Sequence, residues 1–313
     1  MSAPLVVRSL SAAEHDAAAQ LLHRSLVHWY ESRLRQGARF GDRAEPFRIF
    51  PDVYAALDPG EALAAFAPDS GALLGVNFVH PRETHVSVGI VATDPAAQGR
   101  GVARALLAPV LDRARQLGRP ARLVSSLLNL DSFSLYSRLG FVPHTIFQDL
   151  ALSVPAAGFG APRPPGADRV RRVTDPAEAA RLADLEFALQ GIRRERDYAF
   201  FIRNPVGDWR LWAVEDASGR LDGVLAASHD PRFVMLGPGA ARTEEAAAAL
   251  LWRALDAMRG LSPVFLVPSQ ARGLVQQGYG WGARNVELHV AQTTGPLTAT
   301  TGIAFPTFLP ESG

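Results

Sequence analysis

The sequence contains no cysteine, and all 32 of its basic residues are arginine, so lysine is absent as well. Without cysteine the chain has no disulfide, no thiolate nucleophile and no thiolate zinc site. Without lysine it has no Schiff-base or pyridoxal-phosphate chemistry, and it lacks the lysine of Walker-A and protein-kinase sites. The 31 acidic residues leave a formal charge of +1, which favours neither nucleic acid nor an anionic membrane as a partner. We therefore expect a small-molecule partner.

Long apolar runs are also missing. No stretch approaches the roughly 18 residues that a transmembrane helix needs, and residues 1–16 lack the basic and apolar segments of a secretory signal. We expect a soluble, cytoplasmic protein without a membrane partner, and the sequence does not indicate its oligomeric state. The paired histidines His23/His28 and His80/His85 are five residues apart, which suits neither a helical nor a strand face. We therefore expect no metal site.

A segment rich in proline and glycine divides the chain. Residues 155–167 are dense in both residue types, which disrupt helix and sheet, and this predicts a semi-extended linker. It separates a domain at residues 1–154 from a second at 168–292. Residues 293–313 carry Ile303, Phe305, Phe308 and Leu309 among prolines and glycines, and so predict an extended tail that packs against the protein.

The two parts follow the same pattern. Each begins with a strand (4–10; 169–173) and a capped helix, the first opened by the capping box Ser11 to Glu14. Each continues with two strands (72–79 and 84–92; 221–228 and 232–236), a long amphipathic helix, a further strand (122–127; 263–267), a short helix and a final strand. We infer a tandem duplication of an α/β domain of the α+β type, with a twisted mixed sheet flanked by helices in each copy.

A glycine turn is the most informative segment. Gly99 and Gly101 lead from a β-rich stretch into a helix whose apolar residues recur at helical spacing. Glycines allow close approach to the backbone, and the unpaired N–H groups of the first helical turn form an anion site. Arg100 and Arg104 add charge, so a pyrophosphate would fit. The alternative is a plain strand-to-helix turn in which the glycines serve geometry alone.

Further residues around this turn favour a pyrophosphate site over a plain strand-to-helix turn. Gln98-x-x-Gly101-x-Ala103, preceded by Val91-x-Thr93-x-Pro95, resembles the acetyl-CoA pyrophosphate loop of the GNAT superfamily, the acyl-CoA-dependent N-acetyltransferases. Asn129, followed by a short helix with Tyr136 and ending at Gly140-Phe141, resembles the second CoA-contacting element of that family. The resemblance covers residues 4–154 and implies acetyl-CoA as the acyl donor.

The resemblance also implies roles for individual residues. The strand end is expected to offer its backbone to the pantetheine arm, the loop to bind the pyrophosphate, and Asn129 to lie near the pantetheine or thioester. The strand-end residues are Val91, Ala92 and Thr93, and the loop residues are Gln98, Gly99, Arg100, Gly101, Val102, Ala103 and Arg104.

Acyl transfer to an amine needs a base for the amine and an acid for the departing thiolate. Tyr136 occupies the place of the family's acid; the alternative is packing on its helix. For the base, His85 falls where many relatives carry a glutamate, with Glu83 and then His80 as further candidates, although a structural role for His85 is equally compatible. The resemblance thus implies an N-acetyltransferase acting on the amine of a small molecule, and a catalytically inactive acyl-CoA-binding sensor or scaffold is the alternative.

Two regions of the sequence do not show a clear functional pattern. Residues 25–50 are rich in aromatic and acidic residues and either form the acceptor pocket or cover the core. In the second half, Leu236 to Arg242 mirrors the glycine loop by position but lacks its pattern, and Gln276 to Gly280 resembles the tyrosine corner only loosely. We therefore expect the second copy to be degenerate.

Overall fold

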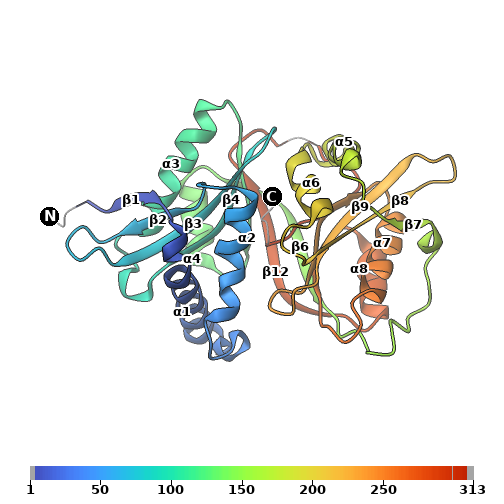
Figure 1. Ribbon diagram of the computed structural model, residues 1–313, viewed down its shortest axis with the longest axis horizontal. Coiled ribbons are helices and arrows are strands. Elements are labelled where there is room, and N and C mark those ends of the chain that lie inside the picture. Colours follow the sequence, from blue (N-terminus) through green and yellow to red (C-terminus); the bar gives the residue numbers. More distant parts are fainter. Residues whose placement is uncertain (1–3, 298, 309–313) are drawn as a thin grey trace. The chain divides into compact units, whose positions relative to one another are not determined.

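The computed structural model describes residues 4–297 and 299–308. The described chain forms two compact units, the first from residues 4–81, 86–121 and 308, and the second from residues 82–85, 122–297 and 299–307. Both units combine β-sheet with α-helices (Figure 1). This partition does not follow the proline-rich segment, and the assignment of separate domains to residues 1–154 and 168–292 stays a prediction.

In the first unit, described strands pair antiparallel in the order β1-β2-β3-β4. They are β1 (Val6–Ser9), β2 (Leu63–Phe66), β3 (Leu73–Pro81) and β4 (Val86–Thr93). The helices are α1 (His15–Leu34), α2 (Ile49–Leu57) and α3 (Val102–Gln116). The predicted capping box is present, since the Ser11 N–H donates to the Glu14 carboxylate (2.9 Å) just before α1. Gly75 lets α3 approach the sheet, because a Cβ there would lie 2.7 Å from Val102 Cγ1.

The second unit holds a longer mixed sheet in the order β5-β12-β6-β11-β10-β9-β8-β7, with β13 paired to β10. Its strands are β5 (Ala121–Ser126), β6 (Val142–Ala151), β7 (Val170–Arg172), β8 (Trp209–Glu215), β9 (Leu221–Ser228), β10 (Met235–Ala241), β11 (Val264–Pro268), β12 (Arg284–Thr293) and β13 (Ile303–Phe305). Its helices are α4 (Leu130–Arg138), α5 (Ala179–Gln190), α6 (Glu195–Arg203), α7 (Glu244–Asp256) and α8 (Arg272–Gly280). Ala121, the first residue of β5, belongs to the first unit.

The order of elements confirms the tandem arrangement. The first half of the sequence runs β1-α1-α2-β2-β3-β4-α3-β5-α4-β6, and the second runs β7-α5-α6-β8-β9-β10-α7-β11-α8-β12. Each element of the first half therefore has a counterpart of the same type in the second. The fold is a duplicated mixed α/β domain, as the sequence predicts.

The final strands of the two halves are exchanged, which the sequence does not reveal. β12 comes from the second half, yet it pairs antiparallel with β5, where His289 is opposite Ser126. β6 comes from the first half, yet it pairs antiparallel with β11, where Phe265 is opposite Leu150. β6 and β12 pair with each other between these two strands. The sheet of the second unit is thus built from both halves of the sequence.

The proline-rich segment and the tail both pack against this unit. Residues 155–166 of the predicted linker contain no helix or strand, and its last residue, Ala167, begins a short 3-10 helix. Phe159 is buried, with its ring 6.2 Å from that of Trp252 and 5.6 Å from that of Trp281. In the tail, Ile303 and Phe305 are buried on β13. Leu309 and the end of the expected tail lie outside the described residues. Within the described ranges, no helix is both long enough and apolar enough to span a membrane.

Candidate functional site

The glycine turn lies between β4 and α3 in the first unit. Asp94 begins it: its carboxylate accepts the Ala96 N–H (2.9 Å) and pairs with Arg24 (2.8 Å). Gly99 and Gly101 have φ angles of 76° and 80°, which favour glycine. A Cβ at either position would meet no atom within 4 Å. The turn therefore needs glycine for its backbone shape, and its surface is open to a ligand.

The start of α3 presents unused N–H groups. Gly101 is the N-cap residue and supplies no side-chain cap, and the first bond of the helix runs from Ala105 N–H to Gly101 C=O (2.9 Å). The N–H groups of Val102, Ala103 and Arg104 precede that bond and have no partner within the helix. Arg100 and Arg104 are exposed beside them. This arrangement suits a bound anion such as a pyrophosphate.

The strand that leads into the turn holds the other predicted cofactor residues of this unit. Val91, Ala92 and Thr93 end β4 and pair on one side with Asn77, Val76 and Gly75 of β3. The structure thus brings residues 91–93 and 98–104 together as one strand end and the turn that follows it. The functional assignments of these residues stay predictions.

Asn129 and Tyr136 lie on α4 in the second unit. Asn129 is the N-cap of α4, and its side-chain oxygen accepts the Ser132 N–H (3.0 Å). Tyr136 is 8% exposed, and its ring packs edge-on against Phe141 at 5.8 Å. Both residues therefore have a structural role, whatever their part in chemistry. A catalytic role for Tyr136 stays a prediction.

The candidate bases differ in their surroundings. His85 lies one residue before β4 rather than on it, and is 1% exposed, with its Nδ1 3.1 Å from the Thr84 hydroxyl. The carboxylate of Glu83 accepts from Arg193 (3.1 Å) and from the Glu195 N–H (3.3 Å). Glu83 would have to leave these contacts to accept a proton from a substrate.

His80 belongs to a buried pair that the sequence does not reveal. Its Nδ1 lies 2.6 Å from the Asp58 carboxylate, both side chains are 1% exposed, and its ring packs 4.7 Å from that of Tyr54. A second such pair joins His289 and Asp149 at 2.9 Å in the other unit. Each pair fixes the orientation of an imidazole. No spacing signal marks either pair, because the partners come from separate elements.

The aromatic residues of the expected acceptor region pack on one another. Ring centroids lie 4.8 Å apart for Tyr30 and Phe40, 6.3 Å for Phe40 and Phe47, and 6.1 Å for Phe47 and Phe50. Tyr30, Phe47 and Phe50 are buried. These side chains therefore cover the core of the first unit between α1 and α2, which is one of the two alternatives that the sequence left open.

The second half lacks a counterpart of the glycine turn. The sequence predicts a loop at Leu236 to Arg242 that mirrors the turn, and this prediction is wrong, because Met235–Ala241 form strand β10. Only Arg242 and Thr243 separate β10 from α7, whereas residues 94–101 separate β4 from α3. The Thr243 hydroxyl accepts the Ala246 N–H (3.1 Å), and Glu244 and Glu245 follow in the first turn. This helix start is capped and negatively charged, so it does not suit phosphate.

The corresponding strand end is also occupied. Gly239, Ala240 and Ala241 end β10 as Val91, Ala92 and Thr93 end β4, and they pair with β13 through Phe305, Ala304 and Ile303. β10 and β11 run parallel only at Met235 and Leu236 before this point. The tail of the chain therefore takes the strand edge that the corresponding site would use.

Comparisons with known proteins agree with this architecture. The sequence model of the acetyltransferase (GNAT) family matches residues 23–141. Among curated proteins, none matches the sequence. A candidate acetyltransferase from Pyrococcus horikoshii shares the fold with a TM-score of 0.70 and 14% identity, over 94% of this chain and 90% of that one.

Two further solved structures are similar along almost the whole chain. A GCN5-related N-acetyltransferase from Sphaerobacter thermophilus has a TM-score of 0.60 and 18% identity, over 95% of this chain and 98% of that one. A tandem GNAT protein from the clavulanic acid biosynthesis pathway has a TM-score of 0.59 and 18% identity, over 94% of this chain and 100% of that one. Residues 23–141 thus carry a domain of the GNAT acetyltransferase family, and the chain has the fold of a tandem GNAT protein. Acyl transfer is the class of reaction that this family supports.

Proposed function

We propose that this protein transfers the acetyl group of acetyl-CoA to the amine of a small molecule. The observation that carries the proposal is the open turn at Gly99 and Gly101, which leads into the uncapped start of α3 within the segment matched by the GNAT family. Its free N–H groups and the flanking Arg100 and Arg104 are the chemistry that a pyrophosphate needs. The backbone of Val91 to Thr93 would receive the pantetheine arm.

The transfer step balances in bonds and in protons. The nitrogen of the neutral amine attacks the thioester carbonyl carbon, the carbon–sulfur bond breaks, and the amine loses a proton to a base while the sulfur gains one from an acid. Tyr136 is the proposed acid, because its phenol carries a transferable proton. His85 is the proposed base and Glu83 the second choice, since Glu83 is held by Arg193.

We also propose that only the first half binds acetyl-CoA. The second half has a capped, acidic helix start at Thr243 and a strand edge already paired with β13. Calorimetric titration with acetyl-CoA should then give one site per chain. Two equivalent sites would overturn this part of the proposal.

A panel of small amines, assayed for release of the CoA thiol, tests the activity itself. Turnover with at least one amine, proportional to enzyme concentration, is the expected result. Saturable acetyl-CoA binding without thiol release across the panel would instead favour the catalytically inactive acyl-CoA-binding protein. Absence of acetyl-CoA binding would overturn both functions.

A further inference from the structure

The tip of the hairpin between β3 and β4 belongs to the second unit. Residues 82–85 lie between two strands of the first unit in the sequence, yet they group with residues 122–297. The tip is a tight turn, in which the Arg82 N–H donates to the His85 C=O (2.8 Å). His85, the proposed base, ends this turn and directly precedes β4. The second unit therefore provides the surroundings of the proposed base.

One short segment of the second half contacts most of this tip. The Arg193 N–H donates to the Thr84 hydroxyl oxygen (3.0 Å), and the Arg193 guanidinium donates to the Glu83 carboxylate (3.1 Å). Both carboxylate oxygens of Asp197 contact Arg82, at 2.9 Å from Nε and 2.7 Å from Nη2. The side chains of this ion pair are only 2% and 1% exposed. Three successive residues of the tip are thus bound to Arg193 and Asp197.

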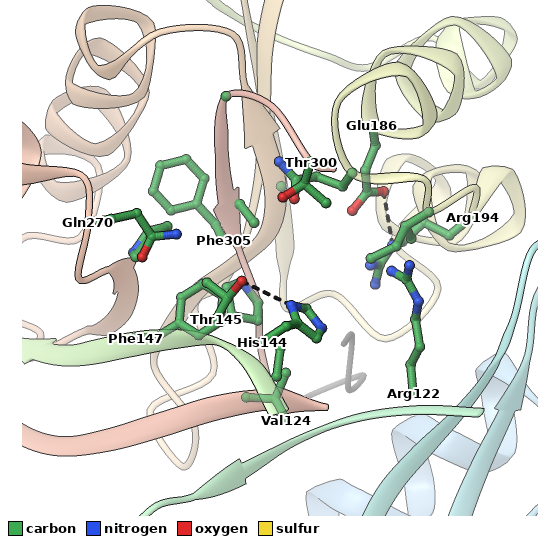
Figure 2. Close-up of a pocket in the computed structure, with 18 residues that line it drawn as sticks. Arg122, Val124, His144, Thr145, Phe147, Glu186, Arg194, Gln270, Thr300 and Phe305 are labelled. Carbon is green, nitrogen blue, oxygen red and sulfur yellow. Dashed lines mark hydrogen bonds and ion pairs between the residues drawn. The ribbon is translucent and has the colours of Figure 1, made fainter. Parts of the chain in front are cut away.

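The segment that binds the tip is itself fixed. Arg194 and Glu186 are each 2% exposed, and Arg194 Nε donates to the Glu186 carboxylate of α5 (2.9 Å). The Tyr198 hydroxyl donates to the same carboxylate oxygen (2.9 Å). Figure 2 shows the Arg194–Glu186 pair at the wall of a cavity in the second unit. Because buried polar contacts of this kind rigidify a structure, residues 193–198 form a firm support for the hairpin tip.

The Thr84 hydroxyl links this support to His85. Its oxygen accepts the Arg193 N–H and lies 3.1 Å from His85 Nδ1. A hydroxyl oxygen has two lone pairs, so it can accept a second hydrogen bond from a proton on Nδ1. In a neutral imidazole one nitrogen carries the proton and the other accepts one. Because Nδ1 faces Thr84, Nε2 is the nitrogen that a substrate would use, and it is basic only when the proton is on Nδ1.

We propose that residues 193–197 of the second half position His85 for proton transfer, with Thr84 as the positioning residue. The Arg193 N–H fixes the Thr84 oxygen, this oxygen accepts the Nδ1 proton of His85, and Nε2 accepts the proton that the amine loses. Only this last step rests on the proposed function. The second half would then take part in the reaction although it lacks the glycine turn.

The tautomer of His85 tests the positioning without a substrate. In the full chain labelled with ¹⁵N-histidine, long-range proton–nitrogen NMR spectra distinguish a protonated ring nitrogen from an unprotonated one, and the signals lost in His85→Gln assign the ring. At a pH where the ring is neutral, the wild type should carry its proton on Nδ1. A proton on Nε2 would overturn the proposal, and this measurement needs no variant of Thr84.

Two substitutions of Thr84 test the role of its hydroxyl. Thr84→Val removes the hydroxyl and keeps the branched shape, so the preference for the Nδ1 tautomer should be lost. Thr84→Ser keeps a hydroxyl and should restore that preference. An unchanged tautomer in Thr84→Val would overturn the proposal.

Thr145 offers a matched control in the same unit. Its hydroxyl oxygen lies 3.0 Å from Nδ1 of His144, so Thr145→Val makes the same chemical change beside another histidine (Figure 2). This variant should alter the signals of His144 and leave those of His85, and turnover, unchanged. Equal effects of Thr84→Val and Thr145→Val on His85 would contradict the assignment.

Turnover tests the consequence for the reaction. With an amine that the chain acetylates, Thr84→Val should lower kcat by roughly tenfold or more and leave the KM for acetyl-CoA unchanged, and Thr84→Ser should recover most of the loss. A tautomer that depends on Thr84, together with wild-type kcat in Thr84→Val, would overturn the positioning role. The same tautomer result in a chain that acetylates no amine would support the fixed orientation of His85 and overturn the proposed function instead.

Discussion

Gly278 occupies in α8 the position that Tyr136 occupies in α4. The Phe141 N–H donates to the Tyr136 C=O (3.1 Å), and the Ala283 N–H donates in the same way to the Gly278 C=O (3.0 Å). Each helix spans the same length and is followed by a glycine of nearly equal φ, 91° at Gly140 and 92° at Gly282. A Cβ at Gly278 would lie 2.7 Å from Leu150 Cδ1. The second half therefore has neither the phenol nor, without rearrangement, the room for it.

This relationship sharpens the prediction for Tyr136. Tyr136→Phe keeps the ring against Phe141 and removes the only transferable proton of the side chain. If the phenol protonates the departing thiolate, kcat should fall by roughly 100-fold or more with little change in acetyl-CoA affinity. Steady-state kinetics and calorimetry measure the two quantities separately.

The matched control is Tyr279→Phe. Tyr279 lies one residue after Gly278 on α8 and donates its hydroxyl to Gln148. We expect wild-type turnover from this variant, because its hydroxyl is not at the corresponding position. Equal turnover of Tyr136→Phe and wild type would reduce Tyr136 to a packing residue.

The glycine turn gives a second prediction. Gly101→Val should weaken acetyl-CoA binding by at least tenfold, because the new side chain would fill the open surface and strain the positive φ. Gly118→Val is the control: Gly118 ends the same helix region with a φ of 61° and open space around it, so the backbone cost is similar. A comparable loss of stability in both variants with a loss of binding only in Gly101→Val is the expected result, from denaturation curves and titrations. If Gly101→Val and Gly118→Val bound acetyl-CoA with similar affinity, the turn would not be the phosphate site.

Truncation near Val154 tests the dependence of the first half on the second. Such a fragment keeps β5 and β6 but loses β12, which lies between them, and β11, which covers the other edge of β6. Unpaired strand edges promote aggregation. We expect the fragment to aggregate or to bind acetyl-CoA without efficient transfer, as judged by light scattering and thiol release. A monomeric, fully active fragment would show that the first half does not depend on the second.

His229 gives a prediction on pH. Burial, with repulsion from Arg210, lowers the pKa of His229 to about 4 from an ordinary 6.5. The unfolded chain therefore binds more protons between these values, so the stability contribution of the neutral ring is complete above pH 6.5 and is lost as the pH falls toward 4. His229→Phe keeps a ring beside Trp212 and cannot ionise. Urea unfolding should show the variant losing about 2 kcal/mol less than wild type between pH 7 and 4, and parallel losses would contradict the assignment.

Local patterns account for much of what the sequence predicts. Strand β9 has the predicted bounds, and the Ser11 to Glu14 capping box opens the first helical region as expected. Both depend on neighbours in the sequence, that is, on hydrophobic alternation and a cap reached within one helical turn. The prediction fails at β10, where glycine and proline indicate a loop. Gly239 is there for close packing, since a Cβ would lie 2.3 Å from the Val224 C=O oxygen.

In the candidate site, too, the sequence reveals some features and misses others. The glycine turn is contiguous, so the sequence reveals it, whereas the Asp58–His80 and Asp149–His289 pairs depend on residues from separate elements. α6 is also missing from the prediction, because its segment is rich in charge and its aromatic face becomes apparent only when Tyr198 and Phe201 are buried. Long-range pairing, rather than local preference, decides these features.

The exchange of β6 and β12 has a consequence for how the chain is made. Ser125 of β5 accepts a hydrogen bond from the Gln292 side chain, which is 167 residues further along. During synthesis, β5 therefore emerges long before its partner β12 exists, and contacts of such sequence separation slow folding. The first copy cannot be completed on the ribosome ahead of the second. Until translation nears its end, the unpaired strand edge of β5 can aggregate with other chains. Expression at low temperature or with chaperones should therefore raise the soluble yield.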